Sequence, residues 1–431
     1  MNGRVRSVAQ DDTVITRSTR VLHPRSASLN LLEAESQVEF KRLISWWSTH
    51  AVRPEIGFWG AIDEAGVPLG DCEPSIILNT RLLWFFSSAF SATGYEVCRA
   101  QAHRAYEMIT QHFYDPSTST FVWTITPQGV PSNRRKQTYA QAFAIYALAA
   151  YAQATQETAA LELAFKAFDQ VQRHFSESRY GGWIEALGPD LEPISDVRLS
   201  EKDLNAPKSM NTHLHILEAY SALYSTAQKL GVGAARLHTI ELALREAVSV
   251  MTSHIVHPKG NTLGLFFDLD WTPQSVIRSF GHDIEASWLI YEAACALGDR
   301  VTIAQAQETA LALANGALEG VSTYGGLYEE MEANGHIRQL HVWWIQAEAL
   351  VGFLNAFHLS GDDVFLTAAL RVWDFIKTYQ IDHEGGEWQE LSRVDDQSTA
   401  SGLMVGPWKC PYHTGRAMLE TIKLTQAMVA S

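Results

Sequence analysis

The stretch SFGHDIEASWLIYEAACAL, residues 279–297, combines the pattern of a buried helix with ionisable residues in its first turn. His282 and Glu285 are three residues apart, which makes them neighbours on a helix face. A carboxylate at that spacing can orient an imidazole and fix its tautomer. The positive end of the helix disfavours imidazolium by about 0.3–1 kcal/mol. These residue types and their spacing therefore predict a neutral histidine that serves as a base near pH 7.

A second histidine has a comparable setting near the end of the chain. His413 follows Pro411 in WKCPYHTGR, and proline is common at the first position of a helix. We therefore expect His413 to lie where a helix begins, as His282 does. Two histidines on different helices can face one ligand from opposite sides. The alternatives are two ordinary core histidines, or a metal site on His282 and Glu285, for which no further ligand has suitable spacing.

Other polar and aromatic residues fall in the same early turns of apolar segments along the chain. A buried charge costs several kcal/mol unless it is paired or hydrated, so six helices with this pattern predict a polar pocket. His213 and His215 are two residues apart, so at most one of them faces the pocket. The set comprises Asn79, Arg81, Tyr139, Gln141, Asn211, His213, His215, Glu218, His282, Asp283, Glu285, His341, Trp343, Trp344, Gln346, Glu348, Trp408, Lys409, Tyr412, His413 and Arg416.

Six loop segments share one sequence pattern, in which turn residues and an aromatic or acidic cluster precede a bend that contains Pro or Gly. They begin at Arg53, Asp115, Ser178, His257, Ser322 and Asp382. They recur about every 60 residues, stretching once to about 80, which indicates a repeated supersecondary unit. An apolar helix is expected after each loop and an amphipathic helix before it, as inner and outer helices require.

This pattern predicts an all-α fold, a single (α/α)6 barrel of about twelve helices whose long loops line a pocket at one end. Ligand sites favour such concavities. An open helical solenoid is the alternative, but the loop aromatics are more typical of pocket walls than of solenoid caps. We expect residues 1–28 to form a loose extension and residues 29–431 to form the barrel and catalytic domain.

Composition and charge exclude several classes of function. The chain of 431 residues has 33 Lys and Arg against 48 Asp and Glu, and its net charge of −15 repels phosphate backbones and anionic membranes. No window approaches about 18 uncharged apolar residues, so no membrane span is expected. We therefore expect no nucleic-acid or membrane partner, and a monomer that binds a small molecule.

The cysteines and the N-terminus suit a cytoplasmic location. The four cysteines form no C-x-x-C pair, so a zinc knuckle is not expected, and a reduced setting fits them best. The N-terminal stretch has no apolar segment of the kind that a signal peptide needs.

Six stretches of the expected inner helices resemble a known family. They are NTRLLWFFSSAF, YAQAFAIYALAAYA, KSMNTHLHILEAYSALY, GHDIEASWLIYEAA, WWIQAEALVGFLNAF and GPWKCPYHTGR, and they span residues 79–416. Together they resemble the N-acylglucosamine 2-epimerase superfamily, and KSMNTHLHILEAY with GHDIEASW resembles its cellobiose 2-epimerase branch. The resemblance implies an (α/α)6 barrel and a carbohydrate epimerase that uses no cofactor and no metal.

The resemblance also implies roles for individual residues. His282 and His413 match the two acid/base histidines that serve C2 of the sugar, and His215 matches the histidine that assists ring opening. Eight further residues match groups that hold or stack against the sugar: Arg81, Tyr139, Asn211, Asp203, Glu285, Trp343, Trp344 and Trp408, where only one of the adjacent Trp343 and Trp344 is expected to face it.

The implied reaction interconverts glucose- and mannose-configured reducing ends, for example cellobiose and glucosyl-mannose. Ring opening exposes an aldehyde, which makes the C2 proton acidic. Its removal gives a cis-enediolate, and reprotonation on the other face inverts C2. No hydride moves, so no nicotinamide is needed, and no G-x-G-x-x-G follows a strand here.

One stretch departs from the family pattern and leaves alternatives open. After GGEW, residues QELSRVDD lack the aromatic residues that would border a second sugar. A mannose/glucose or mannobiose 2-epimerase, or an aldose–ketose isomerase of the same fold, is therefore an alternative. An inverting glycoside hydrolase on the same fold would need two carboxylates about 6.5–9.5 Å apart, from among Asp203, Glu285 and Glu348. A sugar-binding module without catalysis is the third alternative.

Overall fold

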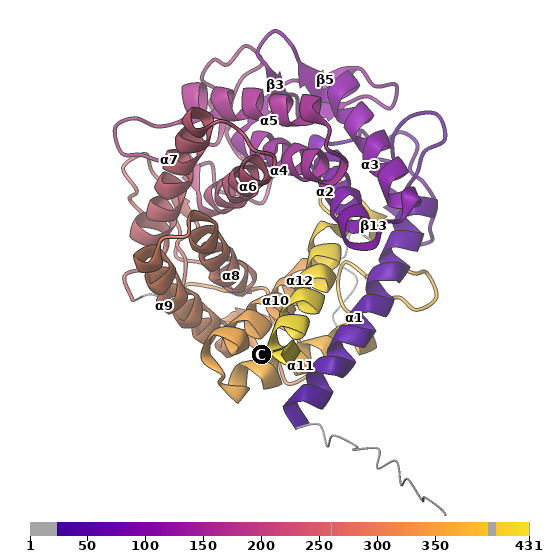
Figure 1. The fold of residues 1–431 in the computed structure, drawn as a ribbon, viewed down its shortest axis with the longest axis vertical. Helices are drawn as coiled ribbons and strands as arrows, with labels where there is room; N and C mark the ends of the chain where they lie inside the picture. The colour runs from indigo at the N-terminus through magenta and orange to yellow at the C-terminus, as the bar shows by residue number, and fades with distance from the viewer. Residues whose placement is uncertain (1–23, 260, 395–401, 431) are drawn as a thin grey trace, which may run out of the picture.

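Twelve α-helices form two concentric rings in the computed structural model, which describes residues 24–259, 261–394 and 402–430. Figure 1 shows an inner ring of helices surrounded by an outer ring. The inner helices are α2 (Ile76–Thr93), α4 (Thr138–Thr155), α6 (Met210–Lys229), α8 (Phe280–Leu297), α10 (Trp343–Ser360) and α12 (Pro411–Ala430). The outer helices are α1 (Pro24–Thr49), α3 (Glu96–Met108), α5 (Thr158–Gln170), α7 (Ala234–Val250), α9 (Arg300–Ala317) and α11 (Asp363–Phe375).

Each inner helix packs against its two neighbours, and contact between α12 and α2 closes the inner ring. The apolar surface of the inner helices runs all the way round because they are covered on every side, as the nearly complete burial of α2, α4 and α10 shows. The outer helices α5 and α11 bury one face only. The prediction of an (α/α)6 barrel is confirmed within the described residues.

Connections alternate between short and long, and this alternation gathers the long ones at one end of the barrel. Each inner helix passes to the next outer helix through a few residues, and Gly94, Gly298 and Gly361 end α2, α8 and α10 in the left-handed conformation that glycine adopts at little cost. The six long loops all precede inner helices. They therefore meet above the first turns of those helices.

Short strands join the six loops into a continuous ring. The strands β6 (Lys136–Gln137), β8 (Lys208–Ser209) and β10 (Arg278–Ser279) each precede an inner helix and pair with the next loop, through β7 (Ala186–Leu187), β9 (Phe266–Phe267) and β11 (Glu330–Met331). The bridges Ser75 to Thr124 and Val342 to Leu391 continue the pattern, and β13 (Leu403–Val405) pairs with β1 (Ile62–Asp63) to close it. The remaining strands are β2 (Tyr114–Asp115), β3 (Thr120–Phe121), β4 (Thr124–Ile125), β5 (Pro131–Asn133) and β12 (Ile337–Arg338).

Four outer helices end in a single π-helical turn, and α9 ends in a 3-10 turn. The π turns are η1 (Ile109–Phe113), η2 (Val171–Phe175), η3 (Met251–Ile255) and η5 (Ile376–Gln380), and the 3-10 turn is η4 (Leu318–Gly320). Each turn leads directly into a long loop.

The fourth residue of several inner helices holds the loop above it through the loop backbone. The amide of Gln141 bonds the N–H and C=O of Phe121, at 2.9 and 3.0 Å, and Gln346 does the same for Leu327, at 2.7 and 2.8 Å. His213 accepts from the N–H of Trp183 at 3.0 Å. The expectation that Gln141 and Gln346 face a pocket is wrong, because at this helical position the side chain points to the loop instead. For His213 and His215 the prediction is only that at most one of them faces the pocket.

The domain division stays a prediction. The predicted extension, residues 1–28, lies outside the described residues up to residue 23, and helix α1 begins at Pro24. Helix α1 packs against α12, so the first and last described helices lie side by side (Figure 1). Every helix in the described part of the chain is too short or too polar to span a bilayer.

Candidate active site

The sixth residue of the inner helices supplies most of the charged groups at the centre of the barrel. These residues are Arg81, Phe143, His215, Glu285, Glu348 and Arg416, in helix order. All six positions are equivalent in the sixfold repeat, so their side chains converge on the barrel axis one turn below the loops. All of the five polar ones are buried, with 1–3% of their surface exposed.

Arg416 lies at the centre of this cluster and binds three carboxylates. Its Nη2 donates to Oε1 of Glu285 and to Oε1 of Glu348, each at 2.6 Å. Its Nη1 donates to Glu218, which also accepts from the hydroxyl of Tyr412. One guanidinium thus joins side chains from α6, α8 and α10. The family resemblance did not predict Arg416, Glu218 or Glu348 as residues of the sugar site. All three were predicted only as polar groups of the inner helices.

His413 and His282 contact the same aromatic ring. The ring centroid of Trp344 is 4.8 Å from that of His282 and 5.5 Å from that of His413. Trp344 is half-buried, whereas its neighbour Trp343 is 6% exposed and lies in the hydrophobic core. Of the two tryptophans, Trp344 is therefore the one whose ring lies beside both histidines.

The two histidines have different partners. Nδ1 of His413 is 2.7 Å from Oε1 of Glu348, whereas Nδ1 of His282 is 2.8 Å from the hydroxyl of Ser279, the N-cap of α8. The predicted pairing of His282 with Glu285 is wrong. Glu285 lies one turn deeper in the barrel, where Arg416 from α12 binds it.

The third histidine lies between a carboxylate and an aromatic wall. Nδ1 of His215 is 3.0 Å from Oε2 of Glu218, and its ring meets that of Tyr139 edge-on at 4.9 Å. The hydroxyl of Tyr139 accepts from Nη2 of Arg81 at 2.8 Å. Arg81 has aromatic rings on several sides, with Phe143 at 4.5 Å and Tyr412 at 4.8 Å from its guanidinium carbon. A cation so placed is available to a negative charge at the site.

Burial dominates the protonation states of the three histidines. It lowers the pKa of His282 to about 3, with nearby His215 adding to the effect. Burial, then Arg81 and Arg416, hold the pKa of His413 well below that of free imidazole. Burial also lowers the pKa of His215, although Glu218 opposes it. All three side chains are therefore neutral near pH 7 and able to accept a proton.

The carboxylates around Arg416 differ in their proton affinity. Burial works against ionisation of Glu218, but Arg416, His215 and Tyr412 outweigh it and lower its pKa to about 2. Burial and the neighbouring Glu348 raise the pKa of Glu285 to about 8, and burial also raises the pKa of Glu348. The cluster thus contains one carboxylate that stays charged and two that compete for a proton.

Comparison with known proteins identifies the family. The family model described as N-acylglucosamine 2-epimerase (GlcNAc 2-epimerase) matches residues 57–417. The cellobiose 2-epimerase of Bacteroides fragilis is 38% identical over 395 residues, which cover 91% of this chain and 99% of that protein. The chain belongs to the N-acylglucosamine 2-epimerase family.

Solved structures of family members share the fold. A cellobiose 2-epimerase from Spirochaeta thermophila is 34% identical with a TM-score of 0.82, covering 93% of this chain and 98% of that one. One from Bacillus thermoamylovorans is 33% identical with a TM-score of 0.84, covering 91% and 99%. This member of the N-acylglucosamine 2-epimerase family is accordingly a sugar 2-epimerase, an enzyme of the isomerase class.

The other residues predicted to bind sugar lie at the loop end of the site. Trp408 is half-buried, 5.8 Å from the ring of Tyr139, and its ring is 6.1 Å from that of Trp123. Asn211 is half-buried in the first turn of α6. Asp203 lies in the loop before α6, where it accepts from the backbone and hydroxyl of Ser200, and no hydrogen bond of its own joins it to the histidines. Sequence reasoning missed Trp123, whose only signal was its place in the second repeated loop.

Glu285 and Glu348 do not have the arrangement that an inverting glycoside hydrolase needs. Glu285 and Glu348 are each 1% exposed and bind the same nitrogen of Arg416, so they cannot flank a glycosidic bond from two sides. One ligand atom from each of Glu285, Glu348 and His413 lies within 4.8 Å of the others, as in some metal sites. The cation beside both carboxylates here is Arg416.

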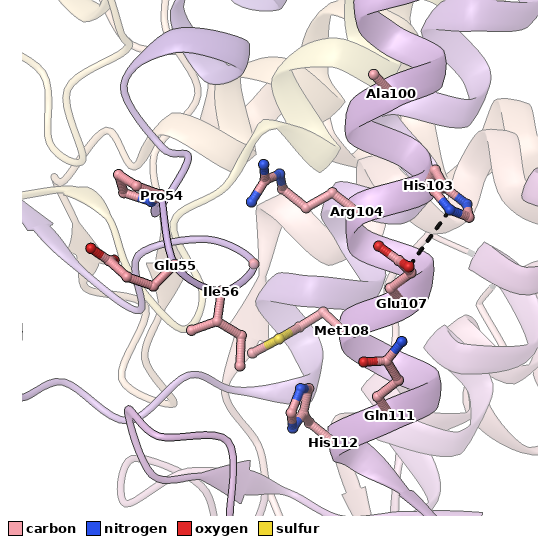
Figure 2. A pocket seen from close by; sticks show the side chains of 11 residues that line it. Pro54, Glu55, Ile56, Ala100, His103, Arg104, Glu107, Met108, Gln111 and His112 are labelled. Carbon is pink, nitrogen blue, oxygen red and sulfur yellow. Dashed lines mark ion pairs between the residues drawn. The ribbon is translucent and has the colours of Figure 1, made fainter.

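Two surface cavities lie away from this site. A groove of about 390 Å³ runs along the outside of the barrel, between residues 54–57 and α3 (Figure 2). His103 and Glu107 form an ion pair at 3.7 Å on its wall, and both are more than half exposed. A second cavity of about 760 Å³ opens at the other end of the barrel, between α1, α2 and α12. No residue that lines either cavity belongs to the predicted sugar site.

Proposed function

We propose that this enzyme inverts C2 of the reducing glucose unit of a disaccharide of the cellobiose type, with His282 and His413 as the acid/base pair. The observation that carries the proposal is that two neutral imidazoles from different helices, α8 and α12, contact the same Trp344 ring. A sugar over that ring would lie within reach of both imidazoles. A single base would return the proton to the face from which it came, so inversion calls for two.

Ring opening precedes the chemistry at C2. The closed sugar must lose a proton from O1 and gain one at O5, and His215 is the neutral imidazole next to Arg81 and Tyr139 that suits this exchange. The contact between Nδ1 of His215 and the carboxylate of Glu218 fixes the orientation and the tautomer of the imidazole. The open aldehyde then makes the C2 proton acidic.

Removal of the C2 proton leaves a planar enediolate whose negative charge collects at O1. The guanidinium of Arg81, buried and hydrogen-bonded to Tyr139, is the fixed positive charge that would stabilise it. Loss of one such donor typically costs about 3–4 kcal/mol of transition-state stabilisation. Delivery of a proton to the opposite face then completes the inversion.

The substrate class rests on the relatives and on the aromatic wall. Several relatives are named cellobiose 2-epimerases. Trp408 and Trp123 offer two half-buried indole faces beyond the histidines, enough for a second sugar ring to stack against. The stretch QELSRVDD still lacks aromatic residues, so free mannose, free glucose and mannobiose are the second candidates, and aldose–ketose isomerisation is a second outcome of the same enediolate.

The test is proton NMR of cellobiose, mannobiose, lactose, mannose and glucose incubated with the enzyme in heavy water. We expect the epimer of cellobiose to form with deuterium at C2. The variants His282→Ala and His413→Ala should each lower kcat at least about 100-fold, the usual contribution of a placed acid or base. His103→Ala, on the exposed side of α3, is the matched control and should keep full activity. Product without deuterium at C2, or a variant that keeps a tenth of the activity, would refute the mechanism.

A further inference from the structure

The two acid/base histidines are unequal as proton carriers. Nδ1 of His413 lies 2.7 Å from Oε1 of Glu348 and 3.9 Å from Oε1 of Glu285. Nδ1 of His282 lies 2.8 Å from the hydroxyl of Ser279. A hydroxyl can donate or accept a hydrogen bond but does not ionise near neutral pH, whereas a carboxyl group can release a proton. Of these two histidines, only His413 therefore has an ionisable group next to its Nδ1.

The buried charges around His413 do not balance unless a proton is present. Three carboxyl groups, those of Glu218, Glu285 and Glu348, bind the guanidinium group of Arg416. A second guanidinium group, that of Arg81, lies near enough to His413 to lower its pKa. With neutral histidines, full ionisation would leave one excess negative charge in a region that is at most 4% exposed. An unpaired buried charge costs several kcal/mol, so the cluster retains one proton.

We propose that Glu285 and Glu348 store one proton for His413, and that this proton moves to Nδ1 as Nε2 of His413 gives its own proton to C2. The inference rests on the proposed two-histidine mechanism and deepens it. In this step the Nε2–H bond breaks as the C2–H bond forms. At the same time the O–H bond of Glu348 breaks as the Nδ1–H bond forms. The imidazole stays neutral and only exchanges its tautomer; the reverse step returns the proton to Glu348.

Titratable and charged groups on all six inner helices lie around the Glu285–Glu348 pair, here called the proton store, or around its neighbours Glu218 and His413. These groups are Arg81 on α2, Tyr139 and Tyr146 on α4, His215 and Glu218 on α6, Glu285 on α8, Glu348 on α10, and Tyr412, His413 and Arg416 on α12. Burial, and then Glu348, raise the pKa of Glu285 to about 8, while burial, Arg81 and Arg416 lower the pKa of His413. The extra proton therefore resides on the carboxyl pair and not on the imidazole. Glu285 and Glu348 act on the reaction only through His413.

The first experiment follows the C2 proton of each epimer in heavy water with the variant Glu348→Gln. A glutamine amide keeps hydrogen bonds to Arg416 and His413 but cannot relay a proton. We expect epimerisation to fall at least about 100-fold in both directions. The half-buried His282 should still exchange the C2 proton of one epimer with solvent, without inversion and within about tenfold of the wild-type rate.

The second experiment measures kcat/KM against pH for the wild type and for Glu285→Gln. Epimerisation in either direction needs one proton, held by His282 or by the Glu285–Glu348 pair. The wild-type kcat/KM should therefore fall above about pH 8, where the carboxyl pair loses this proton. Removing Glu285 removes the like charge that holds the proton on Glu348. The alkaline limb of the variant should therefore move down by about one pH unit. Glu420→Gln, midway along α12 and paired with Lys423, is the matched control and should leave the profile unchanged.

The outcomes separate the store from the mechanism on which it rests. Exchange of one epimer without inversion in Glu348→Gln, or a lowered alkaline limb in Glu285→Gln, supports the store. Loss of exchange for both epimers together with an unmoved alkaline limb overturns it. If Glu348→Gln does not fold, the alkaline limb of Glu285→Gln decides alone. Failure of the wild-type enzyme to place deuterium at C2 would instead refute the two-histidine mechanism itself.

Discussion

At the scale of single residues, the side chains of His215, His282 and His413 each have a pKa below that of free imidazole. The helix N-terminus was expected to favour neutral His282 by a fraction of a pKa unit, but burial is the larger cause. For His413, the positive charges of Arg81 and Arg416 lower the pKa further. Position within the barrel, and not the helix dipole, therefore sets the base form of these side chains.

The low pKa values predict activity in mild acid. A base whose pKa is lowered stays unprotonated until the pH falls to that lowered value, so kcat/KM should decline less than about threefold between pH 7 and pH 5. Unperturbed imidazoles would place the half-point near pH 6.5. Initial rates from NMR would measure this, with intrinsic tryptophan fluorescence at each pH as the check that the enzyme remains folded. Half-maximal activity near pH 6.5 would contradict the expected neutrality.

At the scale of elements, each inner helix uses its first two turns for two different tasks. The fourth residue holds a loop, as Gln141, His213 and Gln346 do, and the sixth points to the barrel axis. The third residue of α8 and of α12 is a histidine, and these two side chains are the acid/base pair that we propose. Helix placement therefore decides chemistry, because a small shift between α8 and α10 would alter the relation of His282 to Trp344.

Gly352 permits the close approach of α10 to α8. A Cβ there would lie 2.5 Å from Cγ1 of Ile284 and 2.7 Å from its carbonyl oxygen, and backbone cannot yield without separating the helices. We expect Gly352→Ala to lower the free energy of unfolding by about 1–2 kcal/mol, even though alanine is favoured in a helix by about 1 kcal/mol.

Urea unfolding and kcat would measure this change. The turnover number should fall as well, since α8 carries His282 and α10 carries Trp344. Gly70→Ala is the control, because nothing lies within 4 Å of the added Cβ. A Gly352→Ala protein of equal or greater stability would show that the helices have room to part.

At the scale of the whole molecule, closure of the barrel depends on contacts between the first helix and the last loop. Nε1 of Trp388 donates to Glu39 at 2.7 Å, and Nε1 of Trp47 donates to Glu387. Glu387 also binds Nζ of Lys409 at 3.0 Å, with both side chains at most 2% exposed. Residues more than 330 positions apart are thus joined where helix α1 meets the loop before α12, a junction that we call the seam.

Removal of Glu387 should weaken the seam severely. The variant Glu387→Ala leaves the ammonium of Lys409 buried without this carboxylate, a change that typically costs about 3–5 kcal/mol. The double variant Glu387→Leu, Lys409→Met removes both charges and should recover most of that loss. Urea unfolding of the three proteins would measure it, and equal stability of the single and double variants would exclude the charge as the cause.

The association state also belongs to this scale. The monomer expected from the sequence stays a prediction, and light scattering of the purified enzyme would test it. The cytoplasmic location likewise stays a prediction.

Periodicity in the sequence was enough to derive the barrel, its six inner helices and the loop end as the place of the site. Repeated spacing reports local geometry, since residues three or four apart on a helix must be neighbours wherever that helix lies. It placed His282, His413 and His215 in early helical turns, and the family resemblance supplied their roles.

Which side chains meet across the barrel axis was decided by the tertiary structure alone. Helical spacing suggested that Glu285 orients His282, but Arg416 binds Glu285 and Glu348 contacts His413. The same spacing could not separate Gln346, which holds a loop, from Glu348, which faces the axis. These pairings depend on how six helices close into a ring, and contacts between residues more than 60 positions apart leave no period in the sequence.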